Sequence, residues 1–284
     1  MEKGDKIAIV CCSNGQPRSY KEKLVKLHEI LVQLGLIPVW GNHIYEISHA
    51  FNGSAEDKAK DLMRFYQDNQ IKAIFDISGG NIANEAISYI DFDVISKSNK
   101  RFCGYSDLTT IINAIYTKTG KTSILYQIRN LLYEDSETQI KNFKNTIIDG
   151  KNDLFNIKYQ FIQKNEMKGI LVGGNIRCLL KLAGTEYWPD MRGKILLLEA
   201  LEGEAPQMVA YFSQLKQMDV FEQVEGLLLG TFTKIEKERC TPDIQELVRR
   251  YAGDKVPIAC TKEIGHNTNS KGVMIGMSMR SSKG

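Results

Sequence analysis

The chain has 284 residues, of which 43% are hydrophobic and 25% charged, so it can bury a large core and is expected to form two domains. Its formal net charge of +3, with lysines and glutamates interspersed, argues against a nucleic-acid-binding or membrane-binding protein. The first residues run into an apolar segment without a signal-peptide pattern, and no apolar run is long enough to span a bilayer. We therefore expect a cytoplasmic protein with no nucleic-acid or membrane partner.

The cysteines and histidines are not spaced as metal ligands. Most cysteines lie within apolar runs, which indicates buried, reduced thiols. The four histidines form no paired motif, which argues against a zinc site. We expect no metal and no cofactor. The cysteines are Cys11, Cys12, Cys103, Cys178, Cys240 and Cys260.

Strands and helices alternate in the first part of the chain, which is typical of a doubly wound, mostly parallel sheet. One helix is marked by Ser54, which is followed three residues later by Asp57 in a variant of the capping box. Strands are predicted at 6–12, 36–40 and 71–77, and helices at 20–34 and 54–70.

A glycine pair, Gly79-Gly80, follows the third predicted strand. Ligands of doubly wound sheets bind beyond the carboxyl ends of the strands, so these glycines either expose amide groups to a ligand or form a simple turn. They are not part of a dinucleotide fingerprint, because Gly-x-Gly-x-x-Gly is absent, and there is no P-loop.

Ser106 follows a short apolar run that ends in Gly104, and an amphipathic helical pattern starts directly after it. This layout is typical of a strand that turns sharply into a helix with a nucleophilic serine at the tip. The amide of Asp107 would then lie at a helix N-terminus, where it can stabilise an oxyanion. The alternative is an ordinary serine N-cap, since Leu108 replaces the second glycine of the usual Gly-x-Ser-x-Gly motif.

The pattern weakens between 126 and 168 and then resumes. We expect this polar segment, with a strand at 155–161, to connect two domains. Gly173-Gly174-Asn175 reads as a turn. Further strands are predicted at 169–172, 194–199, 226–229, 256–260 and 272–277, and helices at 176–183, 206–218 and 242–251.

Two further residues could carry chemistry. Glu199 closes an unbroken apolar strand, where it is either buried with a partner or already solvated outside the sheet. His266 lies in a polar loop between Gly265 and Asn267, a position that is often simply exposed. His28, His43 and His49 are weaker candidates, because no strand end lies beside them.

Taken together, these motifs resemble the LD-carboxypeptidase family of serine peptidases, which includes the microcin C immunity hydrolases. Their order and spacing agree along nearly the whole chain. The matching segments are Gly79-Gly80, Gly104-Tyr105-Ser106-Asp107-Leu108-Thr109, Gly173-Gly174-Asn175, Gly184-Thr185-Glu186-Tyr187, Leu198-Glu199 and Gly265-His266.

The resemblance implies a catalytic triad. Ser106 would be the nucleophile, His266 the general base, and Glu199 the carboxylate that orients the imidazole. The backbone of Gly80 and Asp107 would form the oxyanion hole. No metal would be required.

The resemblance also implies the domain organisation. An N-terminal α/β domain (1–125) would carry Ser106, a connecting segment (126–168) would follow, and a C-terminal α/β domain (169–284) would carry the acid and base. The active site would lie in the groove between the two domains, and a homodimer is expected.

Some positions depart from the family pattern and leave the substrate open. Arg177 and Asn81 occupy variable or altered positions, and Leu125-Tyr126-Gln127 replaces a frequent His-Gly-Pro. A murein-peptide carboxypeptidase must bind a free carboxylate, for which Arg129 and Arg177 are candidates, unless they are surface or structural residues. Gly79, Asn81 and Trp188 are further candidates for contact with the substrate. A hydrolase of aminoacyl or peptidyl nucleotides would favour stacking on Tyr187 or Trp188, although these aromatic residues could instead pack within the loop beside Pro189.

Two other hypotheses stay open. The chain could be a non-catalytic ligand-binding protein on the same scaffold. It could also be a thiol hydrolase that uses Cys103, although this residue is expected to point into the sheet.

Overall fold

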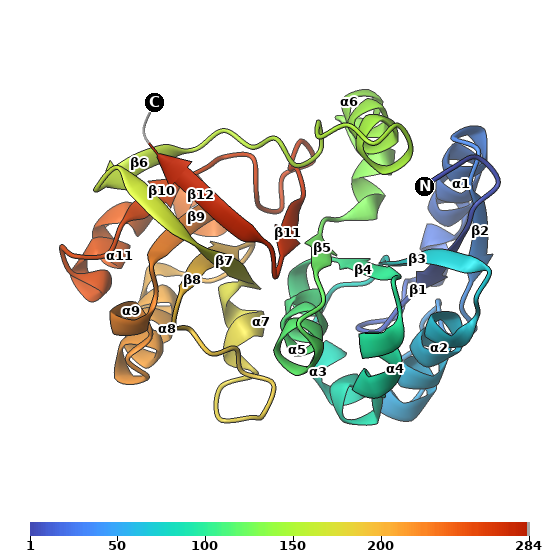
Figure 1. Ribbon diagram of the computed structural model, residues 1–284, viewed down its shortest axis with the longest axis horizontal. Coiled ribbons are helices and arrows are strands. Elements are labelled where there is room, and N and C mark those ends of the chain that lie inside the picture. The colour runs from blue at the N-terminus through green and yellow to red at the C-terminus, as the bar shows by residue number, and fades with distance from the viewer. Residues whose placement is uncertain (283–284) are drawn as a thin grey trace.

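The computed structural model describes residues 1–282 and shows two α/β halves side by side, each built on a six-stranded sheet (Figure 1). The first half contains β1 to β5 and the second β6 to β10 together with β12. The fold class expected from the sequence is confirmed: both sheets are mostly parallel and are combined with helices.

The first sheet has the strand order β11-β5-β4-β3-β1-β2, in which the five N-terminal strands are parallel and β11 is antiparallel. The order reverses between β1 and β3, as in other doubly wound sheets. Its strands are β1 (Lys6–Val10), β2 (Ile37–Trp40), β3 (Ile71–Asp76), β4 (Arg101–Gly104), β5 (Ser123–Leu125) and β11 (Val273–Ile275).

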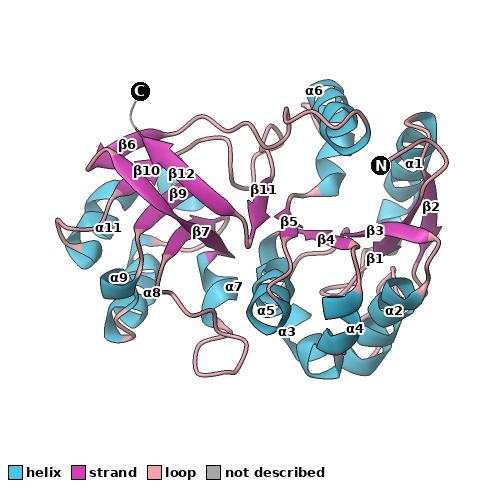
Figure 2. Cartoon of the chain, in the orientation of Figure 1, coloured by secondary structure: helices cyan, strands magenta, loops and turns pink. Residues whose placement is uncertain are grey.

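Helices cover both faces of this sheet (Figure 2). Helices α2, α4 and α5 pack on one face, and α1 and α6 on the other. The helical segments are η1 (Arg18–Tyr20), α1 (Lys21–Gln33), α2 (Ala55–Gln67), α3 (Ala83–Ala86), η2 (Ile87–Tyr89), α4 (Phe92–Lys97), η3 (Ser106–Leu108), α5 (Thr109–Thr119), η4 (Ile128–Leu132), α6 (Ser136–Phe143) and the π-helix η5 (Lys144–Ile148).

The predicted capping box at the start of α2 is confirmed. The Ser54 side chain accepts a hydrogen bond from the backbone N–H of Asp57, and the Asp57 carboxylate accepts one from the Ser54 N–H. This reciprocal pair satisfies two of the N–H groups that a helix start leaves without partners. The helix begins at Ala55, with Ser54 as its N-cap, and ends at Gln67 rather than at the predicted residue 70.

The second sheet has the order β12-β7-β8-β9-β10-β6, with a parallel centre and an antiparallel strand at each edge. Its strands are β6 (Gln160–Gln163), β7 (Glu166–Asn175), β8 (Lys194–Ala200), β9 (Gly226–Phe232), β10 (Ile258–Cys260) and β12 (Ser278–Ser282). Its helices are α7 (Ile176–Leu180), α8 (Ala205–Gln217), α9 (Val220–Gln223), α10 (Thr233–Glu238) and α11 (Ile244–Ala252).

The two faces of the second sheet pack differently. Leu196 and Leu198 of β8 point into a core with α8 and α11. Ile195 and Leu197 of the same strand belong to the hydrophobic cluster that also fills the α2–α5 side of the first sheet. Because one cluster runs through both halves, burial of apolar surface holds them together.

Strand β11 lies within the range 169–284 that the sequence assigns to the second domain, yet it pairs with β5 of the first sheet. Its residues follow the loop that carries His266, so the chain returns to the first half directly after that loop. The strand predicted at 272–277 exists as β11, but local periodicity gave no sign of its partner. The domain boundaries themselves stay a prediction.

Two further expectations were wrong. The strand predicted at 155–161 begins only at Gln160, and 126–168 contains η4, α6 and η5 besides β6. Gly173-Gly174-Asn175 is the end of β7 and pairs with Leu197–Glu199 of β8. Glycine favoured a turn in the sequence, whereas here it allows close packing: a Cβ on Gly174 would lie 2.6 Å from Thr109 Oγ1.

Within residues 1–282, no helix is both long and apolar enough to cross a membrane. In the same range, no group of three or more His, Cys, Asp or Glu side chains is arranged to hold a metal ion.

Candidate active site

Ser106 lies at a sharp turn between β4 and α5. Its φ of +57° is in the left-handed region, which a residue with a Cβ adopts only when the surrounding structure enforces it. The 3₁₀ turn η3 starts at this residue, and α5 follows directly. This is the geometry of a nucleophile elbow, in which strain presents the serine at the carboxyl end of a strand.

Glu199 lies within β8 and is completely buried, so the solvated alternative is wrong. Its Oε1 accepts a hydrogen bond of 3.0 Å from Asn175 Nδ2, which the β7–β8 register places directly opposite. Asn175 Oδ1 accepts from the N–H of Cys178 at the start of α7, and this bond fixes the orientation of the amide.

His266 is nearly buried and bonded to Glu199. Its Nδ1 lies 2.7 Å from Glu199 Oε2, and because an ionised carboxylate only accepts, Nδ1 must donate. In the neutral ring the free lone pair is then on Nε2. Within residues 1–282, that buried nitrogen has no hydrogen-bond partner.

Tyr105, the residue before Ser106, contacts the imidazole of His266. Its ring lies edge-on to the His266 ring, with 5.0 Å between centroids. Burial and the neighbouring Glu199 carboxylate raise the pKa of Tyr105 well above its usual value, so the phenol stays protonated. Tyr105 is adjacent to Ser106, so the elbow approaches the imidazole. In this structure the Ser106 hydroxyl and His266 Nε2 are not hydrogen bonded, and in unliganded enzymes such bonds are often long.

The glycine pair forms the loop that faces the serine. A Cβ built on Gly79 would lie 3.9 Å from Ser106 Oγ. Gly80 has φ +126°, and a Cβ there would lie 2.2 Å from the Asn14 side chain, so only glycine fits. Asn14 Oδ1 in turn accepts from the Asn81 N–H at 3.0 Å.

The carboxylate of Asp107 has a structural role that the sequence did not suggest. It is completely buried, and its Oδ2 accepts from Ser13 Oγ at 2.7 Å and from the Ala83 N–H at 2.8 Å. Its Oδ1 is paired with Lys181, just beyond α7 in the second half. A buried charge is tolerated when it is paired and hydrogen bonded. Here the ion pair joins the two halves of the molecule at the residue that follows Ser106.

Arg177 forms hydrogen bonds with the loop that faces the serine. Its Nη2 donates to the Gly80 carbonyl at 2.8 Å and its Nη1 to Asn81 Oδ1 at 2.8 Å. Lys181, one turn later, donates to the Asn81 carbonyl at 2.7 Å. Both cations therefore bind the Gly79–Asn81 loop.

The helix after Ser106 is also bonded to the second half. Asn113 of α5 donates to the Gly173 carbonyl at 3.0 Å and accepts from the Gly173 N–H at 2.9 Å. Thr109 Oγ1 accepts from the Asn175 N–H at 3.0 Å. These bonds connect the elbow to the strand end that holds Glu199.

The other candidate binding residues differ in surroundings. Trp188 is half-buried and packs against two hydrophobic clusters, the one shared by the two halves and the one between the second sheet and α8. Tyr187 packs against Phe92 with 5.9 Å between ring centroids. Arg129 Nη1 donates to Gln16 Oε1 at 3.2 Å, while its Nε is buried and, within the described part of the chain, unpartnered. Arg129 follows the carboxyl end of β5, at the edge of the sheet where Ser106 lies.

Cys103 is buried in β4. Burial and the nearby Asp76 carboxylate raise the pKa of its thiol well above the usual value, so little thiolate forms. These observations argue against a thiol nucleophile next to the elbow.

If the chain is a hydrolase, alkylation of the native protein with iodoacetamide at pH 8 should leave its rate within about twofold of that of the untreated protein, because the thiolate is the reactive form. Peptide mass spectrometry should find Cys240 labelled first and Cys103 unlabelled. Burial raises the pKa of Cys260 to about 11, so it should react slowly. Protein alkylated in denaturant is the control for complete labelling. Loss of activity in proportion to modification of Cys103 would contradict this.

Several residues of this site were missed or misread from the sequence. Asn175 was interpreted as part of a turn, and Asp107 was named only for its backbone N–H. No role was predicted for the side chains of Tyr105, Asp107 and Lys181. The signal available for Lys181 was its helical spacing of four residues from Arg177, which places both on one side of the helix.

Two family models match the chain in tandem. The LD-carboxypeptidase N-terminal domain matches residues 7–126, and the LD-carboxypeptidase C-terminal domain matches residues 168–280.

Individual proteins and structures are similar over most of their length. A "probable murein peptide carboxypeptidase" of Bacillus subtilis is 27% identical over 97% of this chain and 88% of its own. The microcin C7 self-immunity protein MccF of Escherichia coli is 24% identical over 80% of this chain and 75% of its own. A MccF-like protein from Bacillus anthracis superposes with a TM-score of 0.87 at 28% identity, covering 100% of this chain and 95% of that one. MccF in complex with glutamyl sulfamoyl guanosine gives 0.87 at 18% identity, covering 100% and 97%.

Proposed function

The chain belongs to the LD-carboxypeptidase family, and from this premise we propose that it is a serine hydrolase that removes a C-terminal D-amino acid from murein-derived L,D-peptides. The observation that carries the proposal is the buried 2.7 Å hydrogen bond between His266 Nδ1 and Glu199 Oε2, next to a strained serine elbow. A cytoplasmic location and a homodimer are part of the same proposal.

In the proposed reaction, Ser106 Oγ attacks the scissile carbonyl and His266 Nε2 takes its proton. Glu199 holds the tautomer that leaves Nε2 free to accept, and stabilises the imidazolium that forms. The amine then leaves with the proton from His266, and water hydrolyses the acyl-enzyme by the same route. Within residues 1–282, the buried Nε2 has no hydrogen-bond partner. This supports the role of general base, because a buried polar atom without a partner costs free energy and the proton taken from Ser106 would satisfy it.

The proposed oxyanion donors are the backbone N–H groups of Gly80 and Asp107. Asp107 lies in the first turn of a helical segment, where N–H groups have no helical acceptor. Side chains of the second half position both donors. Arg177 and Lys181 bind the Gly80–Asn81 segment, and Lys181 also pairs with the Asp107 carboxylate. We assign Lys181 as a positioning residue for the oxyanion hole.

Lys181→Met should therefore lower kcat by about a hundredfold, a loss comparable to that of one oxyanion donor, with KM changed much less. The reason is that the buried Asp107 carboxylate loses its counter-ion and the Asn81 carbonyl loses its donor. Steady-state kinetics on the folded variant measure the effect, with circular dichroism to confirm folding. Lys181→Arg should recover part of the rate.

Lys118→Met is the matched control. Lys118 on α5 pairs with Glu186 of the second half at 2.6 Å, so this variant also removes an ion pair between the halves, but an exposed one. Exposed pairs contribute about 0.2–1 kcal/mol, so both activity and stability should stay near wild type. Equal losses of kcat in the two variants would mean that Lys181 acts only by joining the halves.

One cation near the elbow favours a substrate with a free carboxylate. Within residues 1–282, Arg129 is not paired with an acid, and it lies at the carboxyl edge of the first sheet with its buried Nε unpartnered. A partly buried guanidinium without an acidic partner can bind a ligand anion. Its parallel N–H groups match the two oxygens of a carboxylate. This supports the removal of a terminal amino acid.

The second candidate is hydrolysis of an aminoacyl or peptidyl nucleotide. It rests on the similarity to MccF, one structure of which holds glutamyl sulfamoyl guanosine. Such a substrate needs an aromatic ring free to stack on its base, whereas Tyr187 and Trp188 here pack against hydrophobic clusters. We therefore place it second.

Mass spectrometry after incubation with a murein L,D-tetrapeptide and with an aminoacyl sulfamoyl adenosine tests both functions. We expect a tripeptide and free D-amino acid from the first substrate, and little turnover of the second. The all-L tetrapeptide is the control for stereochemistry. Turnover of the nucleotide alone would reverse the order of the two functions, and no turnover of any substrate would favour the non-catalytic hypothesis.

A further inference from the structure

A cavity lies away from the candidate active site. It has a volume of about 790 Å³, and its walls include Lys72 and Arg101, at the amino ends of β3 and β4. Ser106 follows the carboxyl end of β4, whereas Arg101 lies at the amino end of that strand. None of Ser106, Glu199 and His266 lines the cavity.

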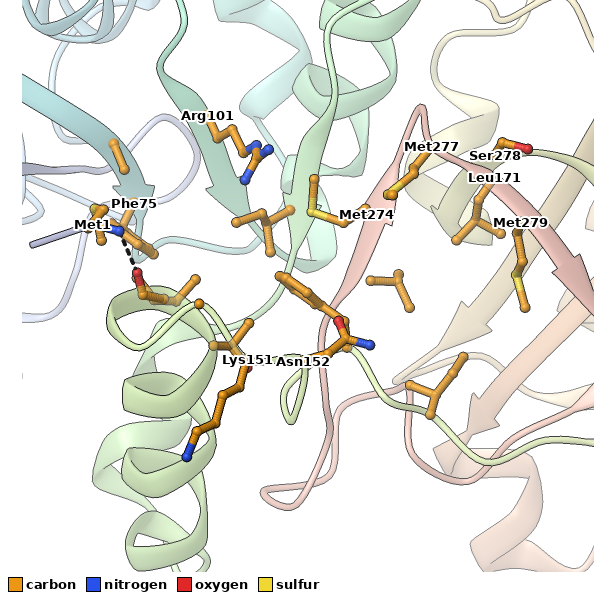
Figure 3. Close-up of a pocket in the computed structure, with 18 of the residues that line it drawn as sticks. Met1, Phe75, Arg101, Lys151, Asn152, Leu171, Met274, Met277, Ser278 and Met279 are labelled. Carbon is orange, nitrogen blue, oxygen red and sulfur yellow. Dashed lines mark hydrogen bonds between the residues drawn. The ribbon is translucent and has the colours of Figure 1, made fainter.

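The cavity is walled by both halves of the molecule. Strand β11 of the first sheet, the Gly276-Met277 turn and β12 of the second sheet form one side (Figure 3). Phe155 and the loop at Lys151 and Asn152 form another. The volume is within the range of about 300–1,000 Å³ that is typical of small-molecule sites.

Methionines make its surface apolar and adaptable. Four of the nine methionines of the chain line this one cavity, beside Phe155, Leu171 and Val273. Met277 is 55% exposed, which is unusual for a large apolar side chain. Unbranched, polarizable thioethers adapt to flexible ligands, and alkyl chains are the most flexible apolar ligands. The four are Met1, Met274, Met277 and Met279.

The charges of the cavity are of one sign. Lys72, Arg101, Lys151 and Arg280 line it, and no aspartate or glutamate does. Within residues 1–282 none of these four side chains forms an ion pair. Arg101 extends toward the cavity from the start of β4, whereas the Lys151 ammonium points away (Figure 3). An apolar cavity bordered only by unpaired cations complements a molecule with an apolar chain and an anionic head.

We propose that this cavity binds a single amphipathic anion, an alkyl chain that carries a carboxylate, phosphate or sulfate group. The chain contacts the methionines and Phe155, and the head group pairs with Arg101 and Arg280. The cavity is recessed between two sheets, which suits a free molecule rather than a bilayer surface. This site is independent of the hydrolytic function proposed above.

Dodecanoate, below its micelle concentration, is the probe. With the full chain labelled at its methionine methyls, titration should shift the NMR signals of Met274, Met277 and Met279 in a saturable way. The signals of Met63, Met167, Met191, Met208 and Met218, which lie outside the cavity, are internal controls and should not move. Acetate tests the head group alone, and dodecyltrimethylammonium tests the tail with the opposite charge. Both should bind at least about tenfold more weakly.

Charge reversal tests the cationic border. Arg101→Glu should weaken dodecanoate binding at least about tenfold by calorimetry, and Arg101→Glu with Arg280→Glu further. Arg250→Glu on α11 makes the same change in net charge away from the cavity and should bind as wild type. Equal binding of the two amphiphiles, or shifts spread over all methionines, would overturn the proposal. So would co-sedimentation with phosphatidylglycerol vesicles without binding of the monomer, or methionine shifts that follow protein concentration alone, which would make this face an interface between two copies.

Discussion

Ser106→Ala is expected to lower kcat by about 10⁴-fold to 10⁶-fold on whichever substrate the wild type hydrolyses, because removal of a triad nucleophile leaves only binding and the oxyanion hole. The fold should be unaffected. Alanine also carries a Cβ, so the left-handed backbone at 106 is no more strained than before. The His266–Glu199 hydrogen bond does not involve the serine and should persist. Single-turnover kinetics measure the loss of rate, and mass spectrometry shows whether the acyl-enzyme forms.

Ser213→Ala on α8 is the matched control, since it removes a hydroxyl from a helix on the far side of the second core. Its activity should equal that of wild type. If Ser106→Ala hydrolysed the substrate at the wild-type rate, Ser106 would not be the nucleophile. An acyl adduct found on another residue would identify the alternative.

The parts of the fold that follow from local sequence were predictable. The capping box at Ser54 and Asp57 marks the start of α2 because both partners lie within three residues of each other. Continuous apolar runs such as 195–198 indicated buried parallel strands, since both faces of such strands are covered. The alternation of these signals was enough for the fold class.

The partner of β11 could not be predicted in this way. Its register with β5 joins residues about 150 positions apart, and the three-residue strand has no pattern that distinguishes one sheet from another. The same holds for the environment of Glu199. Whether it is buried depends on Asn175 across the β7–β8 register and on His266, neither of which is its neighbour in sequence.

The sequence named candidate residues where one residue type dominates the proposed chemistry, and it did not predict the hydrogen-bond network around them. The sequence proposed Ser106, Glu199 and His266 because a resemblance placed them together. It did not predict that Arg177 would bind the Gly80 carbonyl or that Lys181 would pair with Asp107, because both contacts depend on how the two halves dock. In the sequence, an arginine that fixes a loop cannot be distinguished from a surface arginine until the docking of the two halves is known.

Glu199→Gln should lower kcat by about 10⁴-fold with little loss of folding, because the substitution is nearly isosteric and acts through the tautomer of His266. The network dictates how the new amide lies. Asn175 Nδ2 donates toward position 199, and Asn175 cannot turn around, because its Oδ1 already accepts from the Cys178 N–H. The Gln oxygen must therefore face Asn175, and its NH₂ group must face His266 Nδ1.

An imidazole whose Nδ1 accepts from that NH₂ group carries its proton on Nε2 and cannot take one from Ser106. Nitrogen-15 NMR of labelled histidine should show the proton of His266 on Nδ1 in the wild type and on Nε2 in Glu199→Gln. Glu202→Gln, an exposed glutamate on the turn after β8, is the control and should leave both rate and tautomer unchanged. A variant that loses activity with the proton still on Nδ1 would show that the charge of Glu199, rather than the tautomer it selects, is what catalysis requires. One that keeps activity within about tenfold would remove Glu199 from the proposed triad.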